Sequence, residues 1–415
     1  MNKPLLYLAR LALFAVFLTL PFSSFRTFVF GAPIYLPEAV ISIAALLFLS
    51  ALRRREAALR TVPILPIIGF LALFAGITLA AVLTDTRAEP SLGVLKSWIF
   101  FPALFAFLLL QVFRSERDMR EALFVWFLVS ATVAAVTLLP GPAATTTYDG
   151  RLLAFFPSPN HLALFLLPGS VLGWFFVAGQ GRLPKHFLAL GLEGVVLLSL
   201  FRTESSGAIV ASFLGMAALF LGTIFGRKAA RRFLGGILAL VTIALATLVL
   251  SGTWERYASG EVRHSLASRV MIWSAAGAAI ADHPISGIGP RRFQEEYLAL
   301  QDTFPPYLEW AVPHPHDVFL SAWLSGGLIG LLGFLALTAA LSIGAFSGLS
   351  RRSAPSRLLP ATLFGLGTAF IVAGLVDDTY FKNDLACMFW VTVAFSGRYL
   401  RNGKNRNGVP VHATE

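Results

Sequence analysis

Runs of about 20 mostly apolar residues follow one another along almost the whole chain. A helix of this length crosses a hydrocarbon core of roughly 30 Å. We count twelve such runs, and the pattern predicts an all-α, polytopic membrane protein. The runs lie at approximately 5–22, 33–52, 62–83, 92–112, 121–140, 160–179, 187–203, 206–225, 233–251, 317–346, 358–376 and 384–400.

The composition agrees with a membrane protein and excludes an ordinary soluble domain. Of the 415 residues, 56% are hydrophobic and 13% are charged, and the mean hydropathy is +0.73. The first run, with Lys3 and Arg10 near its start, imitates a signal peptide. No convincing small-residue cleavage site follows it, so we interpret it as the first membrane helix.

The formal net charge of +11 predicts an orientation in the membrane. If the N-terminus lies inside, most lysines and arginines fall in inner loops such as LRRREAALR (52–60) and GRKAARR (226–232). We therefore expect both termini to be cytoplasmic. The positive charge then needs no nucleic acid to explain it.

Several common kinds of site have no counterpart in the sequence. Cys387 is the single cysteine, so an intramolecular disulfide is excluded and we expect no cysteine metal site. The chain has no H-E-x-x-H motif, phosphate-binding loop, nucleotide fingerprint or acidic cluster suited to a divalent metal. We expect a metal-independent mechanism without a cofactor.

In this orientation, the unusual polar groups collect on the outer face. We therefore expect any chemistry to face the periplasm or the cell exterior. The segments are TTTYDGRLLAFFPSPNH (145–161), RTESSG (202–207), the long loop 252–315 and DDTYFKND (377–384).

The long loop itself has helical patterning. In SLASRVMIWSAAGAAIADHP (265–284), apolar residues recur at helical spacing until the sequence reaches His283-Pro284. A glycine-punctuated turn and a second short helix, RRFQEEYLALQ (291–301), follow it. We expect this loop to fold over the outer face as a lid.

The spans and the loop divide the chain into three parts. We predict nine membrane helices in residues 1–251 and a large periplasmic loop in residues 252–315. Residues 316–415 would then carry the last three helices and a cytoplasmic tail.

HPHD (314–317) is the first candidate site, because it lies at the outer start of the tenth span. A histidine that points into a partly dry cavity can act as a general base near neutral pH, which makes His316 the candidate catalytic residue. Asp317 has a purely structural alternative as the cap of the following helix. His314 is a further supporting candidate.

Arg202 and Arg269 are candidates for binding a pyrophosphate, since a guanidinium can hold phosphate oxygens bidentately. The alternative for Arg269 is contact with lipid phosphates, and for Arg202 it is snorkelling to the interface. Arg151 and Asn160 lie on the same face, where we favour a structured re-entrant turn over direct chemistry. We predict that Arg202, Arg269 and His316 meet in one outward-opening pocket beside a groove for a prenyl tail.

Three charged residues, Glu38, Lys96 and Glu193, lie in or near apolar runs. An unpaired charge there costs at least about 2.5 kcal/mol on insertion scales. We expect these residues to be paired or interfacial.

Three segments carry a resemblance to a known family. HDVFLSAWLSGGLIG (316–330) resembles the signature of the O-antigen ligase and polymerase superfamily, in which a His-Asn pair precedes a leucine and spaced glycines. SRVMIWSAAGAAIADHPISGIGPRRF (268–293) is similar to the loop segment of that family. GRLLAFFPSPNHLALFL (150–166) is similar to its segment that ends in Pro-Asn before a middle span.

The resemblance implies a membrane-embedded glycosyltransferase of the bacterial inner membrane. It would move a glycan from undecaprenyl pyrophosphate to lipid A-core at the periplasmic face, with inversion and without metal. His316 would activate the acceptor hydroxyl, and Arg202 and Arg269 would hold the pyrophosphate. The implied partners are the lipid-linked donor, the glycan acceptor and membrane lipids.

The sequence departs from the family pattern at two positions. Asp317 stands where the family usually has asparagine, and Ser206 stands where it often has arginine. Arg202, four positions earlier, is about one helical turn away and is the candidate replacement.

Other functions remain open at this stage. Within the family, these are an O-antigen or exopolysaccharide polymerase and a protein-directed transferase. In a different class, a twelve-span secondary transporter would also have this span count and orientation, but transporters place ionisable residues near the bilayer midplane.

Overall fold

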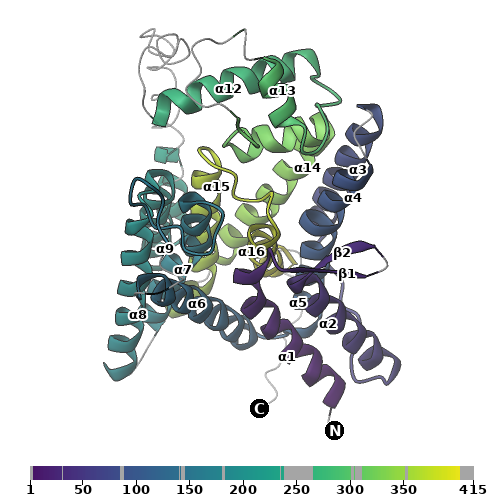
Figure 1. Cartoon of the computed structure of the whole chain (residues 1–415). Helices are drawn as coiled ribbons and strands as arrows, with labels where there is room; N and C mark the ends of the chain where they lie inside the picture. Colours follow the sequence, from purple (N-terminus) through teal and green to yellow (C-terminus); the bar gives the residue numbers. More distant parts are fainter. Residues whose placement is uncertain are drawn as a thin grey trace.

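The computed structural model is an all-α membrane-type fold, which confirms the predicted fold class (Figure 1). The structure describes residues 3–29, 31–84, 88–139, 141, 145–179, 183–233, 235–237, 265–300, 303, 311–350 and 354–401. The elements in chain order are α1 (Pro4–Thr19), η1 (Leu20–Phe22), β1 (Arg26–Val29), β2 (Ala32–Tyr35), α2 (Leu36–Arg53), α3 (Ile64–Leu83), α4 (Ala88–Val94), η2 (Leu95–Phe100), α5 (Phe101–Val112), α6 (Glu116–Leu138), α7 (Pro159–Gly179), α8 (Leu183–Arg202), α9 (Ser206–Phe225), α12 (Ser265–Asp282), α13 (Phe293–Ala299), α14 (Val318–Gly348), α15 (Ala354–Gly374) and α16 (Asn383–Arg401).

Among the described residues, ten helices are long and apolar enough to cross a membrane. They coincide with ten of the twelve apolar runs. The run at 233–251 falls largely outside the described residues. The run at 384–400 forms α16, which is not among the ten but is buried almost throughout its length by the surrounding helices.

A short β-hairpin between α1 and α2 is absent from the sequence-based prediction. Strands β1 and β2 pair antiparallel, with Arg26 opposite Tyr35 and Val29 opposite Ala32. Gly31, in the connecting turn, has a φ of +79°, which glycine adopts without steric cost. The pairing satisfies backbone groups that would otherwise be left open where the chain turns between two membrane helices.

Helices α3 and α14 pack backbone against backbone. A Cβ atom added at Gly76 would lie 2.4 Å from the backbone nitrogen of Gly330, and one at Gly333 would lie 2.3 Å from that of Leu73. Lipid chains provide no hydrophobic drive between membrane helices, so such close packing of small residues is what holds them together.

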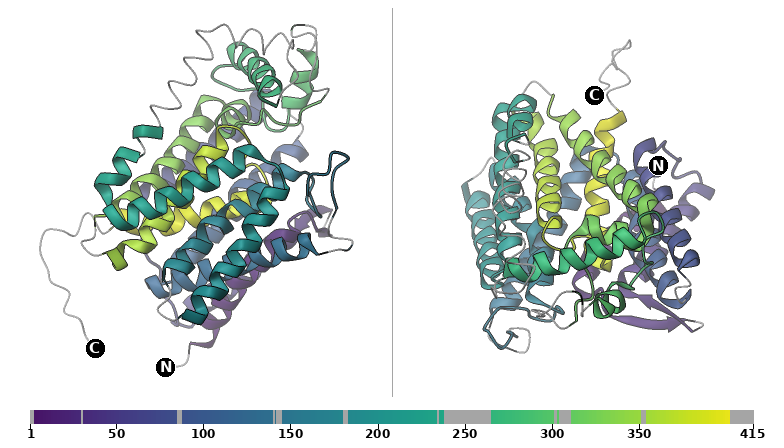
Figure 2. Two further views of the ribbon diagram at one scale, coloured as in Figure 1. Left: turned by 90° about the vertical axis from the view of Figure 1, so that its left-hand side faces the viewer. Right: turned by 90° about the horizontal axis from the view of Figure 1, so that it is seen from above.

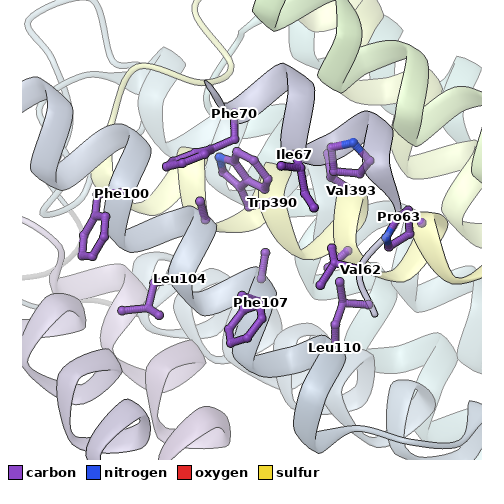
Figure 3. Close-up of a pocket in the computed structure, with 15 residues that line it drawn as sticks. Val62, Pro63, Ile67, Phe70, Phe100, Leu104, Phe107, Leu110, Trp390 and Val393 are labelled. Atoms are coloured by element: carbon purple, nitrogen blue, oxygen red, sulfur yellow. The ribbon is translucent and has the colours of Figure 1, made fainter. Parts of the chain in front are cut away.

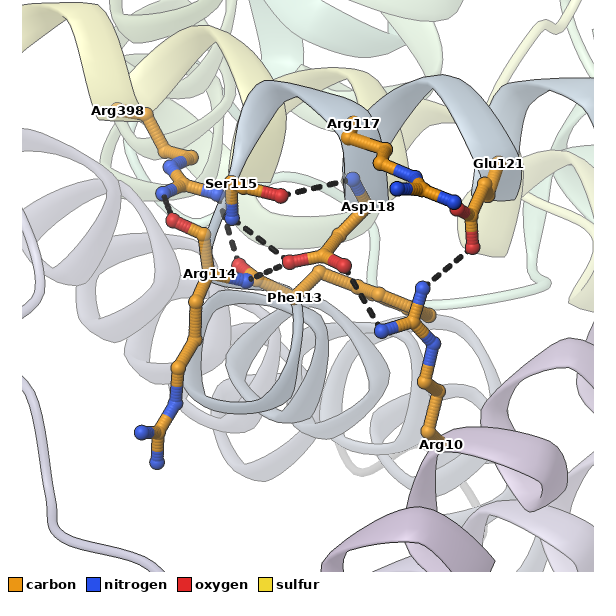
Figure 4. A network of polar contacts seen from close by, with 8 residues as sticks. All are labelled: Arg10, Phe113, Arg114, Ser115, Arg117, Asp118, Glu121 and Arg398. Atoms are coloured by element: carbon orange, nitrogen blue, oxygen red, sulfur yellow. Dashed lines mark hydrogen bonds and ion pairs between the residues drawn. The ribbon is translucent and has the colours of Figure 1, made fainter. Parts of the chain in front are cut away.

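A polar network ties helices together at the end of the bundle where α1 begins and α16 ends (Figure 4). The Arg10 guanidinium donates to Asp118, at 2.8 Å, and to Glu121. The Arg398 guanidinium donates to the carbonyl of Phe113, at 2.7 Å, and to that of the following residue. These contacts link α1, α6 and α16 far from the polar segments at the other end.

Helices α12 and α13 lie across the opposite end of the bundle (Figures 1 and 2). They match the two helices predicted within the long loop. A small hydrophobic cluster that includes Met271, Phe293 and Leu324 packs them on the start of α14. Gly327, inside α14, has a φ of +62°, and the Leu328 amide donates to the Ile285 carbonyl at 3.0 Å. The loop is therefore anchored to α14 through its backbone.

The charges within apolar runs have different environments. Lys96 donates to the Glu38 carboxylate and, at 2.7 Å, to the Pro33 carbonyl, so these two residues are paired as expected. Glu193 differs from the expectation: it is buried in α8, and neither carboxylate oxygen has a hydrogen-bond partner among the described residues. Close packing of α7 on α8 at Gly173 covers that carboxyl.

Candidate active site

The HPHD stretch forms the entry to α14. Asp317 is the N-cap residue, and its Oδ1 accepts hydrogen bonds from the amides of Phe319 (2.8 Å) and Leu320 (2.9 Å). The contacts of Asp317 are therefore those of a helix cap, which was its structural alternative. His316 precedes it with a φ of +52°, a backbone conformation that costs a non-glycine residue energy.

The carboxylate beside His316 belongs to Asp377 and not to the adjacent Asp317. His316 Nδ1 lies 3.1 Å from Asp377 Oδ1, and the Asp377 side chain is almost wholly buried. The ring of His314 packs edge-on against that of His316, with centroids 4.5 Å apart. His314, His316 and Asp377 also place one ligand atom each within 4.8 Å of one another, a spacing that a divalent cation could bridge.

The segment after α15 organises this site. Its Asp378 carboxylate accepts from the Ser321 hydroxyl on α14 at 3.0 Å and from the amides of Tyr380 and Phe381. The Asp378 amide in turn donates to Asp377 Oδ1 at 2.8 Å. The carboxylate that meets His316 is thus held by its own chain before any substrate binds.

Arg269 reaches the same segment from α12. Its Nε donates to the carbonyl of Val376, the residue before Asp377, at 2.8 Å. Arg269 and His316 therefore contact adjacent residues of one segment, Val376 and Asp377. The single pocket of Arg202, Arg269 and His316 stays a prediction.

Arg202 lies at the end of α8 with its side chain exposed. Within the described part of the chain, its guanidinium has no hydrogen bond or ion pair. The turn that follows does approach the site, because a Cβ atom at Gly207 would lie 2.6 Å from the Val376 side chain. The structure thus brings the RTESSG turn to the site without joining the Arg202 side chain to it.

Arg151 and Asn160 hold a loop in place. Arg151 donates through Nη2 to Asn160 Oδ1 at 2.8 Å and through Nε to the Thr203 carbonyl at 3.0 Å. The Leu152 amide also donates to the Arg202 carbonyl at 2.9 Å. These contacts fit the structured turn that we favoured for residues 150–160.

The two groups next to His316, Asp377 and His314, have different charges at neutral pH. Burial acts to raise the pKa of the Asp377 carboxyl, but the hydrogen bond and charge of His316, with His314 and Lys382 nearby, hold that pKa well below its usual range. Burial lowers the pKa of His314 to about 4, although the Asp378 carboxylate opposes the shift. At neutral pH, Asp377 is therefore an anion and His314 is neutral.

A cavity of about 430 Å³ opens beside His314. It lies between the Gly-rich turn before α13, the start of α14, the segment after α15 and Trp98 of the π-helical turn η2. Neither Arg202 nor Arg269 lines it. Its charged and polar lining residues are Ser158, Arg291, Gln294, His314, Ser321, Ser325, Asp378 and Lys382.

An apolar groove of about 310 Å³ lies between α3, α5 and α16 (Figure 3). Phe70 and Trp390 line it together, with ring centroids 6.3 Å apart. The groove extends from Phe100 toward Val62 and Leu110, where α3 begins and α5 ends. It therefore runs away from the His316 end of the bundle.

Two carboxylates with histidine partners are missing from the sequence-based site. One is Asp377, and the other is Asp384, whose Oδ2 lies 2.9 Å from His161 Nε2 in the buried core. Both lie in the DDTYFKND turn, which the sequence analysis placed on the outer face without assigning a role. Its density of carboxylates opposite the HPHD stretch is the signal that could have indicated them.

A comparison with protein families finds one region of similarity. Residues 194–335 match a family model described as O-Antigen ligase. The matched region contains Arg202, Arg269 and His316, and it ends before Asp377. No curated protein matches the chain.

Proposed function

We propose that this chain is a member of the O-antigen ligase and polymerase superfamily, whose family model matches residues 194–335, and that it transfers a glycan from undecaprenyl pyrophosphate to lipid A-core at the periplasmic face. The observation that carries this proposal is the pairing of His316 with Asp377 beside Arg269. A base, an orienting carboxylate and a cation are the groups that transfer from a diphosphate requires.

His316 is the general base in this proposal. Nδ1–H donates a hydrogen bond to Asp377 Oδ1, which leaves Nε2 with its lone pair, because one ring nitrogen of a neutral imidazole donates and the other accepts. Nε2 takes the proton of the acceptor hydroxyl while that oxygen attacks the anomeric carbon. The bond from that carbon to the diphosphate oxygen breaks, and the configuration inverts.

Arg269 stabilises the departing diphosphate. Its Nε contact with Val376 fixes the guanidinium beside the segment that holds Asp377. Preorganised positive charge at the place where negative charge develops is usually the largest contribution to catalysis. Arg202 would approach the diphosphate from the RTESSG turn.

Replacement of the base tests the proposal. His316→Ala should abolish transfer at normal protein level, seen as loss of long-chain lipopolysaccharide from cells and of transfer by purified protein. His283→Ala is a matched control, since His283 is an exposed histidine at the end of α12. Unaltered glycan ladders in His316→Ala cells would contradict the proposal.

The same cells distinguish the alternatives. Lipopolysaccharide that carries single repeat units in a deletion strain would indicate a polymerase. An uptake defect with normal glycans would indicate a transporter, but His316, Asp377 and Arg269 lie at helix ends and not at mid-helix positions.

The mechanism assigns no step to a metal, although three ligand atoms lie close together. The reason is that His316 Nδ1 is occupied by Asp377 in the orientation that general-base catalysis needs. Transfer by purified protein should be unchanged after treatment with a chelator. Loss of transfer with a chelator and recovery with Zn²⁺ would assign the three atoms to a metal instead.

A further inference from the structure

The cavity beside His314 contains basic side chains that the transfer chemistry leaves unused. Arg291 lines it from the turn before α13 and Lys382 from the segment after α15. Arg291 is exposed and Lys382 is half-buried. Neither side chain has a hydrogen bond or ion pair within the described residues. Basic groups without partners that line a cavity favour an anionic ligand.

The single carboxylate in the cavity is already engaged. Asp378 accepts from the Ser321 hydroxyl and from two backbone amides. These neutral donors leave its negative charge in place. The lining holds two basic groups, Arg291 and Lys382, and one carboxylate, Asp378, so a net positive charge faces a ligand.

The rest of the lining suits a sugar. His314, Ser325 and Gln294 add polar groups to the lining. The Trp98 indole, packed edge-on against Phe381 at 6.0 Å, supplies an apolar face. A volume of about 430 Å³ falls within the range of roughly 300–1,000 Å³ for small-molecule sites.

The position of the cavity suits the acceptor better than the diphosphate donor. Its wall includes His314, which packs against His316, whereas Arg269 contacts the chain at Val376 and lies outside the lining. A ligand in the cavity therefore approaches the imidazole pair without occupying the arginine proposed for the diphosphate.

We propose that this cavity is the acceptor subsite and that it selects an acceptor glycan carrying an anionic substituent, a phosphate or a carboxylate, through Arg291 and Lys382. The proposal rests on the proposed function. It adds the chemical class of the acceptor and two residues that determine specificity.

The experiment compares two synthetic glycolipid acceptors that differ only in one phosphate monoester on the sugar. Purified wild-type protein and the Arg291→Gln and Lys382→Gln variants are assayed with the same prenyl-diphosphate donor. Charge-assisted hydrogen bonds contribute enough that loss of one should raise KM for the phosphorylated acceptor about tenfold or more. The KM for the unphosphorylated acceptor and for the donor should stay within about twofold of wild type, because neither loses that hydrogen bond.

Arg291 is the cleaner probe of the two. Lys382 lies close enough to Asp377 and Asp384 to influence their charge, so its substitution also changes kcat. Lys382→Arg should restore the preference for the phosphorylated acceptor. Arg227→Gln is the control for loss of a positive charge, because Arg227 packs over the Phe346 ring at a different place in the bundle.

Each outcome has one meaning. Equal KM changes for the two acceptors, or no change in either, overturn the subsite. A rise in the donor KM alone would assign Arg291 and Lys382 to the diphosphate and would also overturn it. Failure of wild-type protein to transfer to either acceptor would contradict the proposed function itself, independently of these variants.

Discussion

His316 Nδ1 lies 3.1 Å from a carboxylate oxygen of Asp377, although 61 residues separate the two along the chain. In the proposed mechanism, this carboxylate fixes the tautomer of the imidazole and stabilises the imidazolium that forms when His316 takes a proton. Asp377→Asn keeps an acceptor oxygen but removes the charge. We expect kcat to fall by about 100-fold or more, with little change in KM.

A purified transfer assay with separate kcat and KM values checks this prediction. Asp149→Asn serves as the control, because Asp149 is an exposed carboxylate in the loop before α7. A kcat for Asp377→Asn equal to that of wild type would remove Asp377 from the mechanism and leave His316 oriented by other means.

Asp317 should act through the helix and not through its charge. Its carboxylate caps α14 at the amides of Phe319 and Leu320. Asn also caps well, so Asp317→Asn should preserve both stability and transfer. Asp317→Ala should lower the free energy of unfolding by about 1 kcal/mol, measured as a lower thermal unfolding temperature of protein in detergent micelles. Equal losses in both variants would show that the charge itself matters.

The sequence predicts that HPHD and DDTYFKND share one face, because membrane helices alternate in direction. Once the apolar runs and the basic loops are assigned, HPHD and DDTYFKND must fall on the same side. That deduction is correct for His316 and Asp377, which the structure places in contact. The two helices of the long loop are predictable for a different reason. Their apolar residues recur at helical spacing within one short stretch of sequence.

The choice of partner lies beyond such reasoning. DDTYFKND offers three carboxylates, and side-chain direction decides that Asp377 meets His316, Asp378 meets Ser321 and Asp384 meets His161. These directions depend on where α15 ends and α16 begins to within one residue. Patterns of hydropathy do not fix helix ends so closely. The same limit explains why Arg202, one turn from Ser206, could not be placed from spacing alone.

The close packing of α3 on α14 predicts a strong response at Gly76. A Cβ atom there would meet backbone atoms of Gly330 and Gly326 at 2.4 and 2.6 Å, and backbone cannot move aside cheaply. We expect Gly76→Ala to lower the free energy of unfolding by about 1–3 kcal/mol. Gly191→Ala in α8 is the control, since no atom lies within 4 Å of its Cβ position and alanine favours the helix. Similar unfolding temperatures for the two variants would contradict the packing.

His314 predicts a pH dependence of stability. Its pKa in the folded protein is about 4, below the ordinary value of 6.5, because burial disfavours the charged ring. Between these two values the unfolded chain binds a proton that the folded protein does not, so stability is present above pH 6.5 and is lost as the pH falls toward 4. We expect the unfolding temperature to fall between pH 7 and pH 5, and to fall less in His314→Gln. Parallel curves for the two proteins would show that other groups carry the dependence.

The two arginines predicted from sequence should differ in their contribution to catalysis. Arg269 is held by the Val376 carbonyl next to Asp377, whereas the Arg202 side chain is exposed at the end of α8. Removal of a preorganised group that stabilises developing charge costs about 100-fold in kcat, which we expect for Arg269→Ala. Arg202→Ala should cost less than about tenfold in kcat, because a solvated side chain stabilises the diphosphate less.

Both effects are measured as kcat with the prenyl-diphosphate donor. Arg269→Lys should recover only part of the loss, since lysine lacks the bidentate fork. Equal losses at the two positions would mean that Arg202 moves onto the diphosphate in the substrate complex, and the three groups would then form the single pocket that the sequence predicted.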